Sequence, residues 1–177
     1  MGLYSYCVRE LMNKKIVMLV FDISSQKTGF ACFVNAKYDN GKTIDLSKIK
    51  DKDIRLKHMQ MEIIRVCKKY NPKIIVVENP IYKSNIKSYG LLKEILGTIE
   101  GYCIANNIYC HKYYPSEWRK QLKEFGPIPK KRDELKAWSI ESVKKKYLFM
   151  PDDDNHSDAI LIGDAYINEM LDIEQRV

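Results

Sequence analysis

Two short apolar runs, each followed by a carboxylate, constrain the fold more than any other feature of this sequence. Residues 16–21 (IVMLVF) precede Asp22, and residues 73–77 (KIIVV) precede Glu78. Runs of this length that are rich in β-branched residues are typical of strands buried on both faces of a sheet. The sequence therefore predicts an α/β domain in which two central strands each end in an acidic side chain.

The segment between the two runs predicts further strands. Residues 23–29 (ISSQKTG) have the composition of a turn, and residues 30–38 predict a second strand. Asn40-Gly41 is a strong hairpin signal, so we expect residues 42–46 to form a third, antiparallel strand.

A helix is expected to follow these three strands. Apolar residues recur at helical spacing over residues 53–70, and Asp53 is placed to cap that helix. Because a helix then separates the hairpin from residues 73–77, the connection predicts a parallel crossover.

The second half of the chain predicts four more helices and one more strand. Three antiparallel strands followed by parallel crossovers indicate a mixed five-stranded α/β sheet with helices on both faces. This is the layout of the ribonuclease H-like fold, although the order alone also fits other α/β domains. The expected helices cover residues 84–107, 115–122, 130–147 and 155–171, the strand covers 108–113, and residues 126–129 (GPIP) break the chain.

Length and composition exclude several classes of protein. The chain has 177 residues, which suits one domain, and 30 basic against 23 acidic residues give a net charge of +7. No apolar run approaches the length of a membrane span, and no glycine-rich loop that would cradle a nucleotide cofactor is present. The five cysteines include no C-x-x-C pair, which favours a reducing, cytoplasmic location.

The chain start predicts a boundary near Met12, which directly precedes the first strand. We interpret residues 1–11 as an N-terminal extension that is not needed for the fold. Residues 12–177 then form a single domain.

Acidic side chains gather where the predicted elements meet. Adjacent strands bring Asp22 and Glu78 together, and a helix that starts over the same edge presents Asp154 and Asp158, or Asn155 and Asp158, on one face. Oxygen ligands of this kind favour Mg²⁺ or Mn²⁺, and two such ions are a known device for phosphodiester cleavage. Taken singly, each acid also fits a solvated residue or a helix cap.

Four strings in the sequence resemble motifs of one known family, the RuvC-type Holliday junction resolvases. The likeness covers residues 16–170 and keeps the order and spacing of the family's motifs. The string at residues 115–122 is typical of the phage and low-GC Gram-positive branch. They are VFDISSQKTGFA (20–31), IIVVEN (74–79), DNHSDAILI (154–162) and PSEWRKQL (115–122).

The resemblance implies a Mg²⁺-dependent endonuclease that works as a homodimer on branched DNA, above all on four-way junctions. By position, Asp22, Glu78 and Asp158 match the family's acidic ligands. Many members carry a fourth acid three residues before the last one, where this chain has Asn155. Either Asp154 supplies that carboxylate, which we favour, or Asn155 coordinates through its amide oxygen, or the substitution disables catalysis.

Basic residues near these acids are the candidates for DNA contacts. Lys131 is placed to stabilise negative charge on the phosphate during catalysis, and Lys120 is a second candidate. Tyr82, which follows Glu78 closely, is placed to stack on an unpaired base. The cations expected to contact phosphates are Lys83, Lys87, Lys120, Lys130 and Arg132.

Two other functions fit the same residues. A ribonuclease H-like nuclease for RNA–DNA hybrids would keep the acids, and a non-cleaving branched-DNA binding protein would result if Asn155 abolished the metal site. The glycine-containing helix at 84–107 is our candidate for the dimer face, because glycines permit close helix packing; ordinary packing on the sheet is the alternative.

Overall fold

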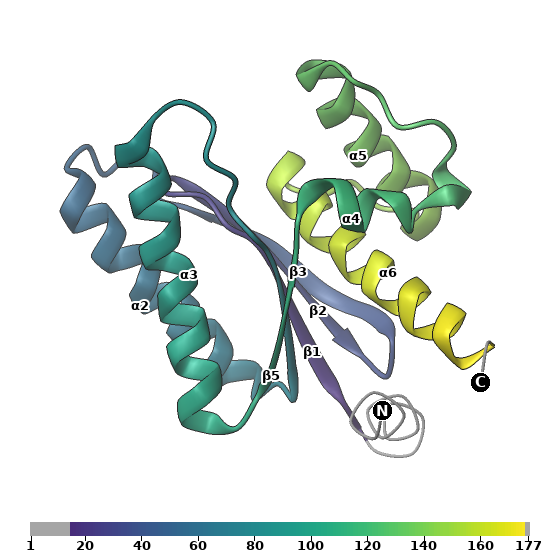
Figure 1. Cartoon of the computed structure of the whole chain (residues 1–177), viewed down its shortest axis with the longest axis horizontal. Helices are drawn as coiled ribbons and strands as arrows, with labels where there is room; N and C mark the ends of the chain where they lie inside the picture. The colour runs from purple at the N-terminus through teal and green to yellow at the C-terminus, as the bar shows by residue number, and fades with distance from the viewer. Residues whose placement is uncertain (1–14, 176–177) are drawn as a thin grey trace.

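A single mixed sheet of five strands forms the centre of the protein (Figure 1). The structure is a computed structural model, and it describes residues 15–175, so the predicted extension at 1–11 lies outside the described residues. The strand order is β3-β2-β1-β4-β5, antiparallel from β3 to β1 and parallel from β1 to β5. The predicted fold class is confirmed. The strands are β1 (Val17–Asp22), β2 (Lys27–Val34), β3 (Lys37–Asp45), β4 (Ile74–Glu78) and β5 (Tyr109–Tyr113).

Helices cover both faces of this sheet. Figure 1 shows α2 (Lys52–Tyr70) and α3 (Ile86–Asn106) side by side on one face. The other face carries α6 (Asp154–Glu174), which is itself covered by α4 (Pro115–Lys120) and α5 (Arg132–Tyr147). In residues 15–175, no helix is both long and apolar enough to cross a bilayer.

Alternation along the strands divides the core into two layers. In β1 and β4, the side chains of Met18, Val20 and Val76 pack with α6, whereas those of Phe21 and Val77 pack with α2 and α3. Side chains two residues apart on a strand share a face. Asp22 and Glu78 therefore continue the layer that faces α6.

The hairpin between β2 and β3 lies five residues before its predicted position. Asn35 and Ala36 form the two-residue turn, both with positive φ (51° and 60°), and β2 already begins at Lys27. The amide of Asn35 donates to the Ile16 carbonyl (3.0 Å), and the Asn35 Oδ1 accepts from the Ile16 amide (2.9 Å), which anchors the turn to the sheet. Asn40-Gly41 instead lies inside β3, where a Cβ on Gly41 would stand 2.3 Å from the Phe30 carbonyl oxygen. Gly41 thus serves close packing rather than a turn.

The cap of α2 also differs from its prediction. Asp51 is the N-cap, because its Oδ1 accepts from the amides of Asp53 (3.0 Å) and Ile54 (2.9 Å). Asp53 lies in the first turn, where its charge still complements the helix dipole. The other predicted helices and the last strand are confirmed, with ends that differ by at most three residues.

Candidate active site

Asp22 and Glu78 lie next to each other at one end of the sheet. The parallel register of β1 and β4 pairs Phe21 with Val77, so the next residue on each strand is one of the two acids. Both side chains project toward α6 and are half-buried. The sheet therefore delivers two carboxylates to the same point, at the carboxyl ends of its two central strands.

The lack of a side chain at Gly29 lets the start of α6 approach Asp22. Gly29 faces Asp22 across the β1–β2 ladder, and a Cβ on Gly29 would lie 1.9 Å from the backbone oxygen of Asn155. Since only glycine leaves that space empty, the first turn of α6 rests directly on the sheet. Asp158, one turn further along α6, then reaches the same end of the sheet as Asp22.

The first turn of α6 is anchored to the edge strand β3. Asp153 is its N-cap and accepts from the amides of Asn155 and His156, both at 3.1 Å. The Thr43 hydroxyl donates to the Asp153 carboxylate (2.5 Å), and the Thr43 amide donates to Asp152 Oδ2 (3.1 Å). These bonds fix the start of the helix that carries Asp158.

His156 is a buried part of this anchor. Its Nδ1 accepts from the Asp152 amide (3.2 Å), so the ring hydrogen is on Nε2, which donates to the Tyr38 hydroxyl (3.0 Å). Burial lowers the pKa of His156, which keeps the ring neutral. His156 therefore holds α6 against β3.

The three carboxylates oppose one another electrostatically. Burial raises the pKa of Asp22 well above its ordinary value, and the charges of Glu78 and Asp158 raise it further. Burial also raises the pKa of Glu78, and it is the main cause that raises the pKa of Asp158 to about 7. Within the described residues, none of the three forms an ion pair. The end of the sheet thus concentrates negative charge that no side chain neutralises by direct contact.

Trp118 and Arg119 on α4 complete the surroundings of this acidic centre. Trp118 is fully buried, and its Nε1–H donates to Glu78 Oε2 (2.8 Å). The Arg119 guanidinium lies over the Trp118 ring at 4.4 Å and lowers the pKa of all three carboxylates. Its buried Nε has no hydrogen-bond partner among residues 15–175. Arg119 was not among the predicted site residues, although it stands beside the predicted Lys120.

The fourth predicted acid has a cation of its own. Asp154 Oδ2 lies 2.7 Å from Lys136 Nζ of α5, a residue that the sequence analysis did not single out. The Asp154 charge still raises the pKa of Asp22 and Asp158, which places it beside the centre. Asn155 is fixed by its backbone contact with Gly29. Both candidates for the fourth ligand therefore flank the acidic centre.

The predicted basic residues lie at the surface, and of them Lys83 alone is tied to one of the three carboxylates by its effect on a pKa. Lys131 is the N-cap residue of α5, and its Nζ lies 3.2 Å from Glu134 Oε1 at the surface. Lys83 lowers the pKa of Glu78, which places its charge near that carboxylate. Tyr82 is 52% exposed, and its ring meets the Tyr89 ring edge-on at 5.8 Å. The other predicted DNA contacts are exposed: Lys87, Lys120, Lys130 and Arg132.

The donor chemistry of the acidic centre fits a hard divalent cation. Oxygen donors without His or Cys suit Mg²⁺ or Mn²⁺, and uncompensated carboxylates are stabilised when such an ion binds. Within residues 15–175, however, no group of three or more His, Cys, Asp or Glu side chains is drawn close enough to hold a metal ion. The carboxylates share one end of the sheet but do not form a closed ligand shell.

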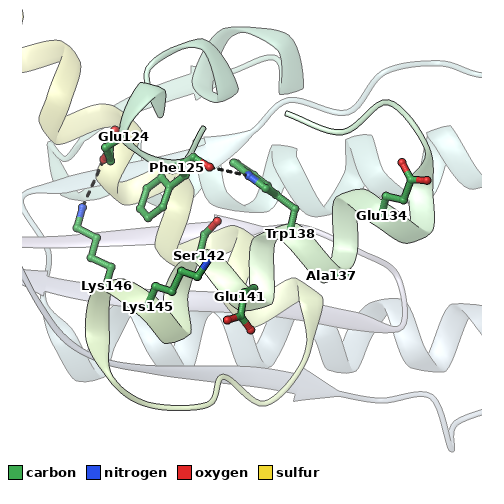
Figure 2. Close-up of a pocket in the computed structure, with 9 residues that line it drawn as sticks. All are labelled: Glu124, Phe125, Glu134, Ala137, Trp138, Glu141, Ser142, Lys145 and Lys146. Atoms are coloured by element: carbon green, nitrogen blue, oxygen red, sulfur yellow. Dashed lines mark hydrogen bonds and ion pairs between the residues drawn. The ribbon is translucent and has the colours of Figure 1, made fainter. Parts of the chain in front are cut away.

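A groove lies away from the three carboxylates. Figure 2 shows this groove of about 750 Å³, formed by α5 and the short 3₁₀ helix Lys123–Phe125. The Trp138 Nε1–H donates to the Phe125 carbonyl (3.3 Å), and the Lys146 ammonium lies 3.7 Å from Glu124. None of the three site carboxylates lines this groove.

Comparisons with known proteins agree with the predicted resemblance. No family model matches the chain. The crossover junction endodeoxyribonuclease RuvC of Caldicellulosiruptor saccharolyticus is 23% identical over 145 residues, which cover 79% of this chain and 85% of that protein.

Two solved structures share the fold. Thermus thermophilus RuvC, solved in complex with a Holliday junction substrate, has a TM-score of 0.66 at 14% identity, over 86% of this chain and 93% of that one. The yeast mitochondrial Holliday junction resolvase has a TM-score of 0.61 at 13% identity, over 99% of this chain and 89% of that one. The chain is therefore similar to the RuvC-type Holliday junction resolvases in both sequence and fold, as its motifs predicted.

Proposed function

We propose that this protein is a structure-selective endonuclease that cleaves Holliday junctions and other branched DNA. The observation that carries the proposal is the meeting of Asp22, Glu78 and Asp158 at one end of the sheet, with their charges uncompensated by ion pairs. The similarity to RuvC over most of the chain supports the choice of branched DNA as substrate.

Magnesium is the cofactor that these residues suit, with Mn²⁺ as a substitute. Asp22, Glu78 and Asp158 would hold it, together with Asp154 or Asn155. Bound Mg²⁺ supplies an activated water and stabilises the leaving oxygen in phosphodiester hydrolysis. The products expected are a 5′-phosphate and a 3′-hydroxyl.

The chain's own side chains would prepare this chemistry. Trp118 fixes one oxygen of Glu78 by its hydrogen bond, so the carboxylate keeps one orientation. Arg119 presents a buried Nε–H that finds no partner in the described part of the chain, beside the three acids. A phosphate oxygen drawn to the centre would receive that hydrogen bond, and the guanidinium would stabilise the negative charge that develops there.

The exposed cations around the site would hold the DNA. Lys83 lies near Glu78, and the net charge of +7 favours binding to phosphates in general. Contacts of this kind make binding salt-dependent and carry little sequence information. Tyr82 is exposed beside Lys83 and would stack on a base at the branch point.

A homodimer would provide the two sites that two cuts require. The outward face of α3 suits such an interface: among the described residues, a Cβ on Gly90, Gly97 or Gly101 would meet no atom within 4 Å beyond its own helix backbone, so these glycines do not pack on the sheet. Ile86 (67% exposed) and Ile104 (84% exposed) lie on the same face, nine residues either side of position 95. In an antiparallel pair of α3 helices, Ile86 of one copy would meet Ile104 of the other, with the glycines allowing close approach between them.

Cleavage of a synthetic four-way junction in Mg²⁺ tests the nuclease proposal. We expect symmetric cuts by the wild type, loss of cleavage in Asp22→Asn and Glu78→Gln, and retained junction binding in both. Asp172→Asn is the control for the loss of one carboxylate, because Asp172 is exposed near the end of α6, fourteen residues after Asp158. Cleavage of an RNA–DNA hybrid alone would reject the junction substrate, and binding without cleavage would favour a binding protein.

The fourth ligand is tested by two further variants. If Asp154 completes the site, Asp154→Asn loses cleavage while Asn155→Asp changes it little. If the site lacks its fourth acid, Asn155→Asp gains activity. These outcomes distinguish a ligand role of Asp154 from a site that lacks its fourth acid.

Sedimentation analysis of Gly97→Glu tests the dimer. The added side chain has room in the monomer, so the variant should fold, but two glutamates at the centre of the interface should dissociate the pair. Met61→Glu on α2, which is 57% exposed, is the control for a new surface charge. A Gly97→Glu protein that sediments as the wild-type dimer would reject α3 as the interface.

A further inference from the structure

A groove at the edge of the sheet opposite β3 contains two cysteines. It has a volume of about 610 Å³ and lies where the end of α3 meets β5. Cys103, in the last turn of α3, is buried, whereas Cys110, in β5, is partly exposed. Both line the groove, and Cys110 is the more exposed of the two.

The two thiols are held in contact by the backbone that joins them. The Cys103 thiol donates a hydrogen bond to the Cys110 sulfur. Asn107 ends α3 in the left-handed conformation, and the Ile108 amide donates to the Cys103 carbonyl (2.9 Å), which turns the chain directly into β5. A disulfide needs an S–S distance of about 2.05 Å, so two thiols that share a hydrogen bond must still approach each other to form one.

The surroundings of Cys110 also differ from those of the other described cysteines. The hydrogen bond from Cys103 lowers the pKa of the Cys110 thiol, and Lys112 acts in the same direction against burial and Glu100. Burial raises the pKa of Cys32 to about 11 and that of Cys67 to about 12. The thiolate is the reactive form of cysteine, so Cys110 is the described cysteine best prepared to attack an electrophile.

We propose that Cys110 and Cys103 form a reactive thiol pair, which small-molecule disulfides oxidise to an intramolecular disulfide bond. The Cys110 thiolate attacks one sulfur of the small disulfide, forms a mixed disulfide and releases one thiolate. Cys103 loses its proton to solvent and attacks the Cys110 sulfur, which expels the second thiolate. The protein dithiol is thereby oxidised and the small disulfide is reduced to two thiols.

Thiol counting and mass spectrometry with oxidised glutathione test this proposal. A Cys7→Ser background removes the cysteine outside the described residues and leaves four thiols. We expect the oxidised protein to lose two thiols and two hydrogens in mass, and peptide mapping to join Cys103 to Cys110. Cys103→Ser should stop at a mixed disulfide on Cys110, and Cys110→Ser should react much more slowly. Cys67→Ser and Cys32→Ser should oxidise as the background protein does.

Several results would overturn the proposal. Four thiols that survive incubation would do so, as would a map that joins any other pair. Equal reactivity of Cys110→Ser and the background would show that Cys110 is not the attacking thiol. Circular dichroism of each variant confirms that it is folded during the reaction. The groove lies outside the proposed active site, so none of these results depends on whether the chain cleaves DNA.

Discussion

Gly29→Ala should damage the acidic centre without touching a carboxylate. The added Cβ would lie 1.9 Å from the Asn155 oxygen, 2.3 Å from the Asn155 carbonyl carbon and 2.8 Å from the His156 nitrogen, all backbone atoms. Contacts under 3.0 Å are not tolerated, so the start of α6 must move by about 1.1 Å. Overpacking of this kind costs about 1–3 kcal/mol of stability. A displacement of about 1 Å in catalytic groups can slow turnover about 100-fold.

The assay compares unfolding in urea with cleavage of a four-way junction. Gly163→Ala is the matched control, because its Cβ would also clash between α6 and β2, at 2.3 Å from the Phe33 ring, but further along the helix from the acids. We expect both variants to lose stability and only Gly29→Ala to lose turnover out of proportion. Wild-type turnover in Gly29→Ala would refute the claim that this contact positions α6 for catalysis.

Three further predictions follow from the surroundings of the site. Asp153→Ala removes the N-cap of α6, so it should cost about 1 kcal/mol of stability and slow cleavage. Asp51→Ala removes the equivalent cap of α2, so it should cost similar stability and leave turnover unchanged. Urea unfolding and junction cleavage measure both variants. Arg119→Gln should slow cleavage about 100- to 1000-fold with little loss of junction binding. Lys123→Gln is the control for the loss of a nearby positive charge. Equal cleavage rates for the two variants would contradict the role of Arg119. Burial lowers the pKa of His111, so the unfolded chain binds a proton at a higher pH than the folded protein does. The free energy of unfolding should therefore fall as the pH drops below about 6.5. Urea unfolding at pH 7.5 and 5.5 should show a smaller fall in that free energy for His111→Gln than for the wild type.

The acids of the site were predictable because local rules place them. Asp22 and Glu78 each end a buried strand, and parallel neighbours bring such ends together whatever the details of packing. Asp158 was predictable because it lies one turn into a helix whose start is marked by a run of acidic residues. Gly29, Arg119 and Lys136 were not singled out, because their roles depend on how α4, α5 and α6 dock, which periodicity does not specify.

The position of the hairpin also depended on packing that the sequence pattern does not specify. Asn40-Gly41 carries the stronger turn signal, yet the chain turns at Asn35-Ala36, where bonds to Ile16 favour that register. At Gly41 the need for space beside Phe30 and His156 outweighs turn chemistry. A glycine seen in sequence marks either a turn or a close contact, and only the packed sheet decides between them.

The most direct test of the central claim is the position of bound metal. Crystals grown with Mn²⁺ and measured for anomalous scattering should show density beside Asp22, Glu78 and Asp158 at the carboxyl end of the sheet, and none there in Asp22→Asn. Mn²⁺ bound only elsewhere on the protein, or an acidic centre that stays without metal while the protein cleaves junctions in the same buffer, would contradict it.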